Sequence, residues 1–272
     1  MICFVEKWIV NKRSQRMLAW SLGLLVMVGA TRLLAEVPNS LSDAESRAGF
    51  QLLFNGQDLK GWRHRGNWKV EEGAISRADR GGSLVYVGEK VPDDFELRFE
   101  WKVAKGSNSG VYYRPGQYEY QILDNRVHRD GKNPRTSAAS LYFCMAPSRD
   151  VTQPAGQWNT GRIVCQGTVI QHWLNGEKVV GFDYTDPRWK ANVDLLRARG
   201  GELAARGAQL SLQDHGDPVW YRSLRWRARK ATDQLDGAPV TPPVISPEVL
   251  AAESKKLELI RQRRQQAQQK KE

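Results

Sequence analysis

The sequence of 272 residues contains only three cysteines and four histidines, and no Cys/His spacing in it resembles a zinc site. Cys3 precedes an apolar segment near the N-terminus, which leaves Cys144 and Cys165 for the rest of the chain. Both lie in apolar, strand-like stretches where buried free thiols are common, whereas two cysteines in an oxidising compartment can also pair. The sequence leaves both alternatives open.

The N-terminal apolar run is too short for a membrane span. It extends from Met17 to Ala30, about 14 residues, whereas a spanning helix needs about 20. A basic stretch precedes it and small residues follow, with Ala30 and Ala35 as candidate cleavage positions, which is typical of an export signal. We interpret residues 1–35 as a signal peptide and expect a periplasmic or extracellular protein. It would contact a membrane only if this segment stayed uncleaved.

Basic charge is sparse in the middle of the chain, although the formal net charge is +11. Residues 1–35 contribute +4 and residues 247–272 contribute +3, which leaves +4 for residues 36–246. That middle segment has no basic face interleaved with aromatic residues. The composition therefore argues against nucleic acid as a partner.

Alternation of apolar and charged residues dominates the segment 50–230. In DFELRFEWKVA (94–104), five apolar side chains share one face and four charged ones share the other, which indicates a long, half-buried strand. TVIQHWLNGEKVVGF (168–182) predicts a hairpin that turns at Asn175-Gly176. In 218–229 the alternation slips by one residue, which predicts a β-bulge near Arg222-Ser223.

Further strands are expected throughout this segment, at 67–70, 74–77, 83–87, 109–114, 118–123, 139–144, 159–167 and 208–213. So many short strands predict two packed sheets, an all-β jelly-roll β-sandwich. One short helical insertion is expected at 187–206, broken at Gly200-Gly201. Residues 231–246 resemble a proline-containing linker. Residues 247–272 form a basic, polar tail that is either helical or disordered, and an anionic surface would be its natural partner.

Polar side chains concentrate within strands in three places. KGSNSGVYYR (105–114) carries Asn108 and Arg114, and YEYQILDN (118–125) carries Glu119, Gln121 and Asp124. SLQDHGDP (211–218) groups three more at a strand end: Gln213, Asp214 and His215. Amide, carboxylate and guanidinium groups match the donors and acceptors of sugar hydroxyls. Each segment alone is explained by turn capping or exposure, but three of them in one small sandwich favour a shared carbohydrate site.

Trp158 adds an aromatic candidate to that site. Most of the ten tryptophans should belong to the core, because an indole ring buries a large area. Trp158 adjoins a polar loop instead. It could stack on the apolar face of a sugar ring, and we include it among the substrate-binding candidates.

Six segments follow one another along the chain in a recognisable order: LLFNGQDLKGW (52–62), NSGVYYR (108–114), YEYQILDN (118–125), PAGQWNT (154–160), HWLNGEKVV (172–180) and LQDHGDPVWYR (212–222). This co-linear series resembles a known bacterial family, the 3-keto-disaccharide hydrolases, also described as 3-keto-glucoside lyase/hydratase domains. The resemblance covers about 180 residues. It implies a jelly roll of the concanavalin A-like lectin and glucanase type, with the substrate on the concave sheet.

The resemblance also implies a chemistry. A ketone at C3 of a glucoside acidifies the C2 proton, so that a base can remove it, the C1 substituent leaves by β-elimination, and water adds afterwards. The catalytic candidates are Glu119 and His215 as base or acid, with Asp214 orienting His215 or binding a cation. Asn108, Arg114 and Gln121 are candidate donors to the sugar. A divalent cation held by Glu119, Asp124 or Asp214 would serve the enolate, although no cofactor is certain.

A second function remains open at this point. The same fold serves lectins as readily as glucanases, and a fold does not fix a function. A non-catalytic carbohydrate-binding module of the cell envelope is therefore the alternative. Retention of glycan binding in Glu119→Gln, without turnover, would distinguish it from an enzyme.

Overall fold

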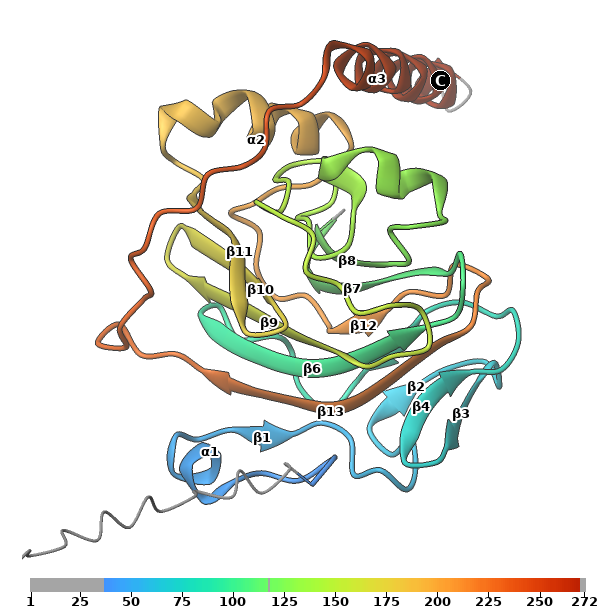
Figure 1. Cartoon of the computed structure of the whole chain (residues 1–272), viewed down its shortest axis with the longest axis vertical. Helices are drawn as coiled ribbons and strands as arrows, with labels where there is room; N and C mark the ends of the chain where they lie inside the picture. Colours follow the sequence, from blue (N-terminus) through green and yellow to red (C-terminus); the bar gives the residue numbers. More distant parts are fainter. Residues whose placement is uncertain (1–36, 117, 270–272) are drawn as a thin grey trace, which may run out of the picture. The chain divides into compact units, whose positions relative to one another are not determined.

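Two antiparallel sheets form the core of the described chain (Figure 1). The computed structural model describes residues 37–116 and 118–269, so the predicted export signal lies outside the described residues. The larger sheet has eight strands in the order β11-β10-β9-β6-β13-β4-β3, with β1 paired to β13, and the smaller has five in the order β2-β5-β12-β7-β8. The predicted all-β jelly-roll sandwich is confirmed.

The strands of the larger sheet are β1 (Gln51–Leu52), β3 (Trp68–Glu71), β4 (Ala74–Arg77), β6 (Phe95–Val103), β9 (Asn159–Gln166), β10 (Val169–Leu174), β11 (Glu177–Asp183) and β13 (Val219–Ala228). Those of the smaller sheet are β2 (Trp62–Arg63), β5 (Leu84–Tyr86), β7 (Asn108–Arg114), β8 (Tyr118–Leu123) and β12 (Ser211–Leu212). All neighbours in both sheets pair antiparallel.

Strand β6 shows how the alternating sequence builds the core. Its five apolar side chains are at most 3% exposed. Phe99 packs edge-on against Tyr120 of β8, with ring centroids 5.2 Å apart, and so joins the two sheets. Since burial of one such side chain stabilises the fold by about 1.5–3 kcal/mol, the apolar face of β6 contributes strongly to the sandwich.

The predicted bulge and hairpin are both confirmed. The pairing of β13 with β6 shifts register between Arg222 and Arg225, and Ser223 has a φ of 55°. The shift places the apolar side chains from both halves of the strand in the core: Val219, Tyr221, Leu224 and Trp226. In the hairpin, β10 and β11 are joined by Asn175 and Gly176, whose φ angles of 50° and 83° suit a two-residue turn.

Three expected elements differ from the structure. The strand expected at 139–144 is a series of turns, because Ala139 and Phe143 have φ angles of 64° and 60° that interrupt an extended chain. The strand expected at 208–213 is reduced to β12. The helix expected over 187–206 is a 3₁₀ turn, η3 (Pro187–Trp189), followed by α2 (Lys190–Ala198), and it ends before Gly200, whose φ is 96°.

Two further helices flank the sandwich sequence. Helix α1 (Asp43–Arg47) begins with a capping box, in which Ser42 and Glu45 each accept from the other's backbone N–H. Glu45 also binds Arg225 of β13 at 2.6 Å and thereby ties α1 to the larger sheet. After a segment without regular structure at 231–246, the chain forms α3 (Pro247–Gln269).

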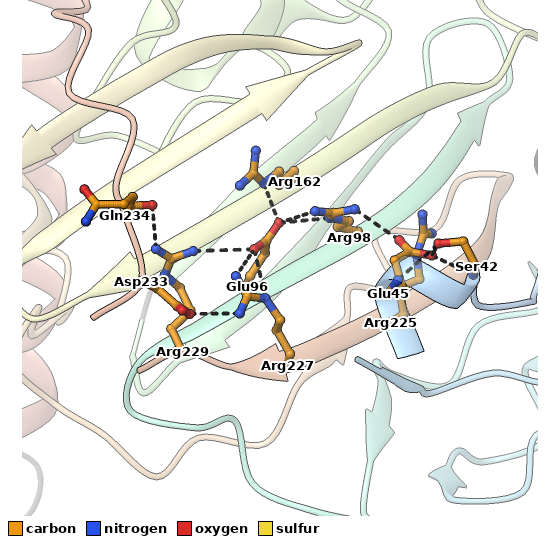
Figure 2. A network of polar contacts seen from close by, with 10 residues as sticks. All are labelled: Ser42, Glu45, Glu96, Arg98, Arg162, Arg225, Arg227, Arg229, Asp233 and Gln234. Carbon is orange, nitrogen blue, oxygen red and sulfur yellow. Dashed lines mark hydrogen bonds and ion pairs between the residues drawn. The ribbon is translucent and has the colours of Figure 1, made fainter. Parts of the chain in front are cut away.

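A buried carboxylate organises the outer face of the larger sheet (Figure 2). Glu96 is 1% exposed, and its oxygens lie near four guanidinium groups: Arg98 at 2.8 Å, Arg162 at 2.7 Å, Arg227 at 3.0 Å and Arg229 at 3.5 Å. Burial alone would raise the pKa of Glu96, but the surrounding arginines lower it. The carboxylate therefore holds together β6, β9 and the end of β13.

Cys144 and Cys165 are both buried and free. Burial raises the pKa of the Cys165 thiol to about 11 and keeps it protonated. Of the two alternatives that the sequence leaves open, the structure therefore has the free thiols. Over the described ranges 37–116 and 118–269, we find no helix with the length and apolar character of a membrane span.

Candidate functional site

A pocket of about 100 Å³ lies on the outer face of the smaller sheet, and we call it the sheet pocket. The residues that line it are Asn108 and Tyr112 from β7, Glu119 and Gln121 from β8, Gln213 and His215 following β12, and Asp130, Tyr142 and Arg199 from the segments above the sheet. Five of the nine residues predicted from the sequence meet here. The polar strand segments therefore share one site.

Strand alternation brings these side chains to one face. On β7, Val111 and Tyr113 are fully buried in the core, so the residues between them point outward. Tyr112 pairs with Glu119 across the β7–β8 ladder, which places their side chains side by side, and Gly110 pairs with Gln121. The same alternation that builds the core thus builds the floor of the pocket.

Glu119 is the most perturbed group of the sheet pocket. It is 3% exposed, and burial raises its pKa to about 8, against a weaker lowering by its hydrogen bond with Tyr112 and by the charge of Arg199. The Tyr112 hydroxyl donates to Glu119 Oε2 at 3.2 Å and accepts from Gln213 Nε2 at 2.9 Å. A buried carboxyl with a pKa near neutrality is suited to general acid–base chemistry.

Three amide oxygens of the sheet pocket have no hydrogen-bond partner within residues 37–116 and 118–269. They belong to Asn108, Gln121 and Gln213, and all three atoms are buried. Buried acceptors in native proteins are nearly always satisfied, so each of these oxygens costs stability unless a ligand supplies a donor. Sugar hydroxyls are donors of the required kind.

The segment 126–146 covers the sheet pocket and contributes Asp130 and Tyr142. It contains the short 3₁₀ helices η1 (Arg129–Lys132) and η2 (Pro134–Thr136). His172 of β10 supports it from within the core, because its Nδ1 donates to the carbonyl of Ala139 at 2.9 Å while its Nε2 accepts from Tyr113 at 2.8 Å. Burial lowers the pKa of His172 to about 4, so the imidazole is a neutral support for the segment.

Asp214 does not line the sheet pocket, contrary to its expected catalytic role. Its oxygens bind Arg77 at 2.5 Å and accept from Asn67 and from the backbone N–H groups of Gly81 and Gly82. Burial would raise its pKa, but these donors lower it to about 2. Nor does Asp214 orient His215, whose Nδ1 lies 3.4 Å from Asp217 instead. Asp214 fixes the loop after β12 to strand β4.

Arg114, Asp124 and Trp158 also lie outside the residues that line the sheet pocket. Arg114 is buried, donates to the carbonyl of Asp93 and covers the ring of Phe95, because a register shift after Tyr112 turns it inward. Asp124 accepts from the backbone N–H of Gly106 at 2.7 Å and ties the residue after β8 to the approach to β7, at the end of the hairpin opposite its turn.

The ring of Trp158 is covered by two cations of the larger sheet and is not open for stacking on a sugar. The Arg222 guanidinium lies 4.1 Å from its ring centroid and Lys102 Nζ lies 5.0 Å from it. Cation–π contacts of this kind anchor the ring. The structure therefore gives Trp158 a packing role.

Four residues of the sheet pocket were missed from the sequence: Tyr112, Asp130, Tyr142 and Arg199. Tyr112 could have been predicted from strand alternation, because it lies four residues after Asn108 on the same strand. The other three come from the covering segment and from the end of α2, where no periodicity indicates direction. Arg199 packs over the rings of Tyr142 and Phe143 at 4.9 and 4.8 Å.

The proposed cation site does not fit the arrangement of the carboxylates. Among the described residues, no group of three or more His, Cys, Asp or Glu side chains lies close enough to hold a metal ion. Glu119 is paired with Tyr112, while Asp124 and Asp214 bind backbone N–H groups elsewhere. We therefore derive no step of the chemistry through a metal.

Fold and pocket together define a class: a jelly-roll sandwich whose smaller sheet carries a buried carboxyl and unpaired acceptors for a hydroxylated ligand. Two crystal structures of proteins from Parabacteroides distasonis, both assigned as glycosyl hydrolases, share the fold. One is 25% identical with a TM-score of 0.60 and covers 71% of this chain and 100% of its own. The other is 25% identical with a TM-score of 0.55, and the match covers 66% of this chain and 99% of the other protein.

The chain belongs to the family described as 3-keto-alpha-glucoside-1,2-lyase-like domains, which matches residues 49–227. It is also similar to a 3-keto-disaccharide hydrolase of Bacteroides thetaiotaomicron, with 30% identity over 229 residues that cover 65% of this chain and 77% of that protein. The resemblance read from the sequence is confirmed.

Proposed function

We propose that this protein cleaves the glycosidic bond of 3-keto-glucosides by elimination and hydration, with Glu119 as the base. The observation that carries the proposal is the buried Glu119 carboxyl, with a pKa raised to about 8, beside three unpaired amide oxygens. Family membership and the 3-keto-disaccharide hydrolase relative support the substrate class.

The reaction balances without a cofactor. The C2–H proton passes to Glu119, and the electron pair forms an enolate on the C3 oxygen. The enolate collapses to a C1=C2 double bond as the C1–O bond breaks, and the leaving oxygen takes a proton. Water then adds across the double bond, with hydroxyl to C1 and a proton to C2. The net change is hydrolysis.

The residues of the sheet pocket match these needs. A carboxylate with a pKa near 8 is a stronger base than an ordinary one, which favours removal of a weakly acidic C–H proton. Arg199 lines the same pocket and supplies positive charge for the enolate oxygen. We assign His215, at the rim of the pocket, to protonation of the leaving oxygen. Asn108, Gln121 and Gln213 would accept from the sugar hydroxyls.

Deuterium incorporation tests the mechanism directly. In D₂O, we expect the protein to release both sugars from the 3-keto form of a glucosyl disaccharide and to place deuterium at C2, as measured by mass spectrometry. The unoxidised disaccharide should stay intact, and a reaction without protein corrects for spontaneous exchange. Cleavage of the unoxidised sugar without deuterium at C2 would indicate direct displacement. Binding without any turnover would favour the lectin-like alternative.

Gly110 offers a test of Glu119 that keeps the carboxylate. A Cβ at position 110 would lie 2.0 Å from Glu119 Oε1, so Gly110→Ala must displace that side chain. We expect kcat/KM to fall by about 100-fold, since a misplacement on the order of 1 Å has that effect. Gly237→Ala is the matched control, because nothing lies within 4 Å of its added Cβ. Activity retained in Gly110→Ala would argue against Glu119 as the base.

A further inference from the structure

Helix α3 packs against the segment that covers the sheet pocket. Glu253 of α3 is 4% exposed and binds Arg135 Nη1 at 2.5 Å and Asn133 Nδ2 at 2.9 Å. Lys256, one turn further along α3, lies 3.4 Å from the Tyr142 hydroxyl and 5.2 Å from the ring centroid of Phe143. A buried ion pair and a cation over an aromatic ring fix the helix at this place.

A second pocket of about 220 Å³, the helix pocket, lies between α3 and the covering segment. One wall carries Arg129, Asp130 and Lys132, and the other carries Val249, Ala252 and Lys256. The volume equals that of about seven water molecules in the liquid. The helix pocket is therefore built jointly by the family domain and by a helix beyond it.

The two pockets adjoin. Asp130 lines both of them. The contact between Lys256, which lines the helix pocket, and Tyr142, which lines the sheet pocket, joins them at a second point. The helix pocket is therefore the space next to the sheet pocket on the side of Asp130 and Tyr142.

The helix pocket carries an excess of positive charge. Arg129, Lys132 and Lys256 face it, against the carboxylate of Asp130, while Glu253 is neutralised by its pairing with Arg135. The helix lies outside residues 49–227, which are those that match the family. Of the three cations, Lys256 alone therefore comes from outside the family domain, whereas Arg129 and Lys132 belong to it.

We propose that α3 completes a leaving-group subsite in the helix pocket and that this subsite favours an anionic, carboxylate-bearing leaving group. The inference rests on the proposed function and deepens it, because it names the chemical class of the part that departs. Lys256 is the residue of α3 that would contact the carboxylate. The remaining cations of the pocket come from the covering segment.

A matched pair of substrates tests the subsite. These are two aryl 3-keto-glucosides whose phenols carry either a carboxymethyl group or its neutral methyl ester, so that the leaving groups differ mainly in charge. For the wild-type protein we expect a KM about fivefold lower for the carboxylate, the size of a partly exposed ion pair. Added salt should reduce this preference, since such pairs are screened.

Two lysine variants of α3 distinguish an effect of the subsite from an effect of the net charge of the helix. Lys256→Met should abolish most of the preference by raising KM for the carboxylate toward the KM for the methyl ester. Lys255→Met removes the same charge from the next residue, which is exposed and does not line the helix pocket, and should keep the preference. Equal KM values for the two substrates in the wild type, or equal losses in both variants, would overturn the inference.

Failure of the proposed function can be told apart from failure of the subsite. If the wild type turns over neither substrate, the proposed chemistry is wrong, and calorimetric binding of carboxymethylphenyl glucoside then tests the subsite alone. Binding that is weakened in Lys256→Met but not in Lys255→Met supports the subsite. Binding that is equal in all three proteins, or absent, overturns it.

Discussion

Replacement of Glu119 by glutamine is expected to lower kcat for 3-keto-disaccharide cleavage by about 10³-fold, within the usual contribution of a general base. Glutamine keeps the shape of the side chain but cannot accept the C2 proton. Rates of product release measured at saturating substrate give the comparison, and Glu100→Gln serves as a matched control on the outer face of the larger sheet. A variant with more than a tenth of wild-type activity would exclude Glu119 as the base.

The same group predicts the pH dependence of the wild type. Because burial raises the pKa of Glu119 to about 8 in the free protein, its basic form grows as the pH rises through that value. We therefore expect kcat/KM to increase with pH and to level off above about 8. A kcat/KM that instead declines across this range would identify Glu119 as the acid of the reaction.

Glu119→Gln should also make the protein more stable at alkaline pH. Between pH 4.5 and about 8 the folded protein holds a proton on Glu119 that the unfolded chain has lost, so stability falls as the pH rises through this window. The variant lacks this loss and should gain on the order of 3 kcal/mol relative to wild type at pH 8, but little at pH 4.5. Denaturant unfolding at both pH values measures it. A gain in stability that does not depend on pH would contradict a raised pKa of Glu119 in the folded protein.

Replacement of Glu96 by glutamine is expected to destabilise the fold by about 3–5 kcal/mol, the usual effect of removing one partner of a buried ion pair. Four guanidinium groups converge on this carboxylate (Figure 2), and without it they repel each other across β6, β9 and the end of β13. Urea unfolding at pH 7 measures the loss. The pKa of Glu96 is lowered in the folded state, so its stabilisation is present above pH 4.5 and disappears on acidification.

Glu100→Gln provides the comparison for Glu96. Glu100 lies on the same strand and face, is 19% exposed, and pairs with Arg222 at 2.7 Å as its one ion-pair partner among the described residues. We expect its loss to change stability by less than about 1 kcal/mol. Similar losses in the two variants would mean that the convergence of arginines on Glu96 has no special effect.

The sandwich and half of the site followed from short-range patterns. The alternation in β6 and the phase slip in β13 were sufficient, because strand side chains alternate with a period of two and a misplaced face would expose the core. The same parity placed Asn108, Glu119 and Gln121 on one side of the smaller sheet. In the sequence, Asp214 is a polar residue like its neighbours Gln213 and His215, so the pattern cannot tell a structural role from a role in the site. Only its partners, Arg77 and the N–H groups of Gly81 and Gly82, distinguish it as structural.

The sequence by itself determined most of the strands, the bulge, the hairpin and the polar strand residues of the sheet pocket, since each depends on residues adjacent along one strand or turn. The tertiary structure alone decided what covers that floor. Tyr142 and Arg199 come from irregular segments far apart in the chain, and Glu253 reaches Arg135 from a helix beyond the family domain. Contacts of this kind have no local period, because they arise from the packing of whole segments. That packing buries Glu119, raises its pKa and gives a single carboxyl the chemistry we assign to it.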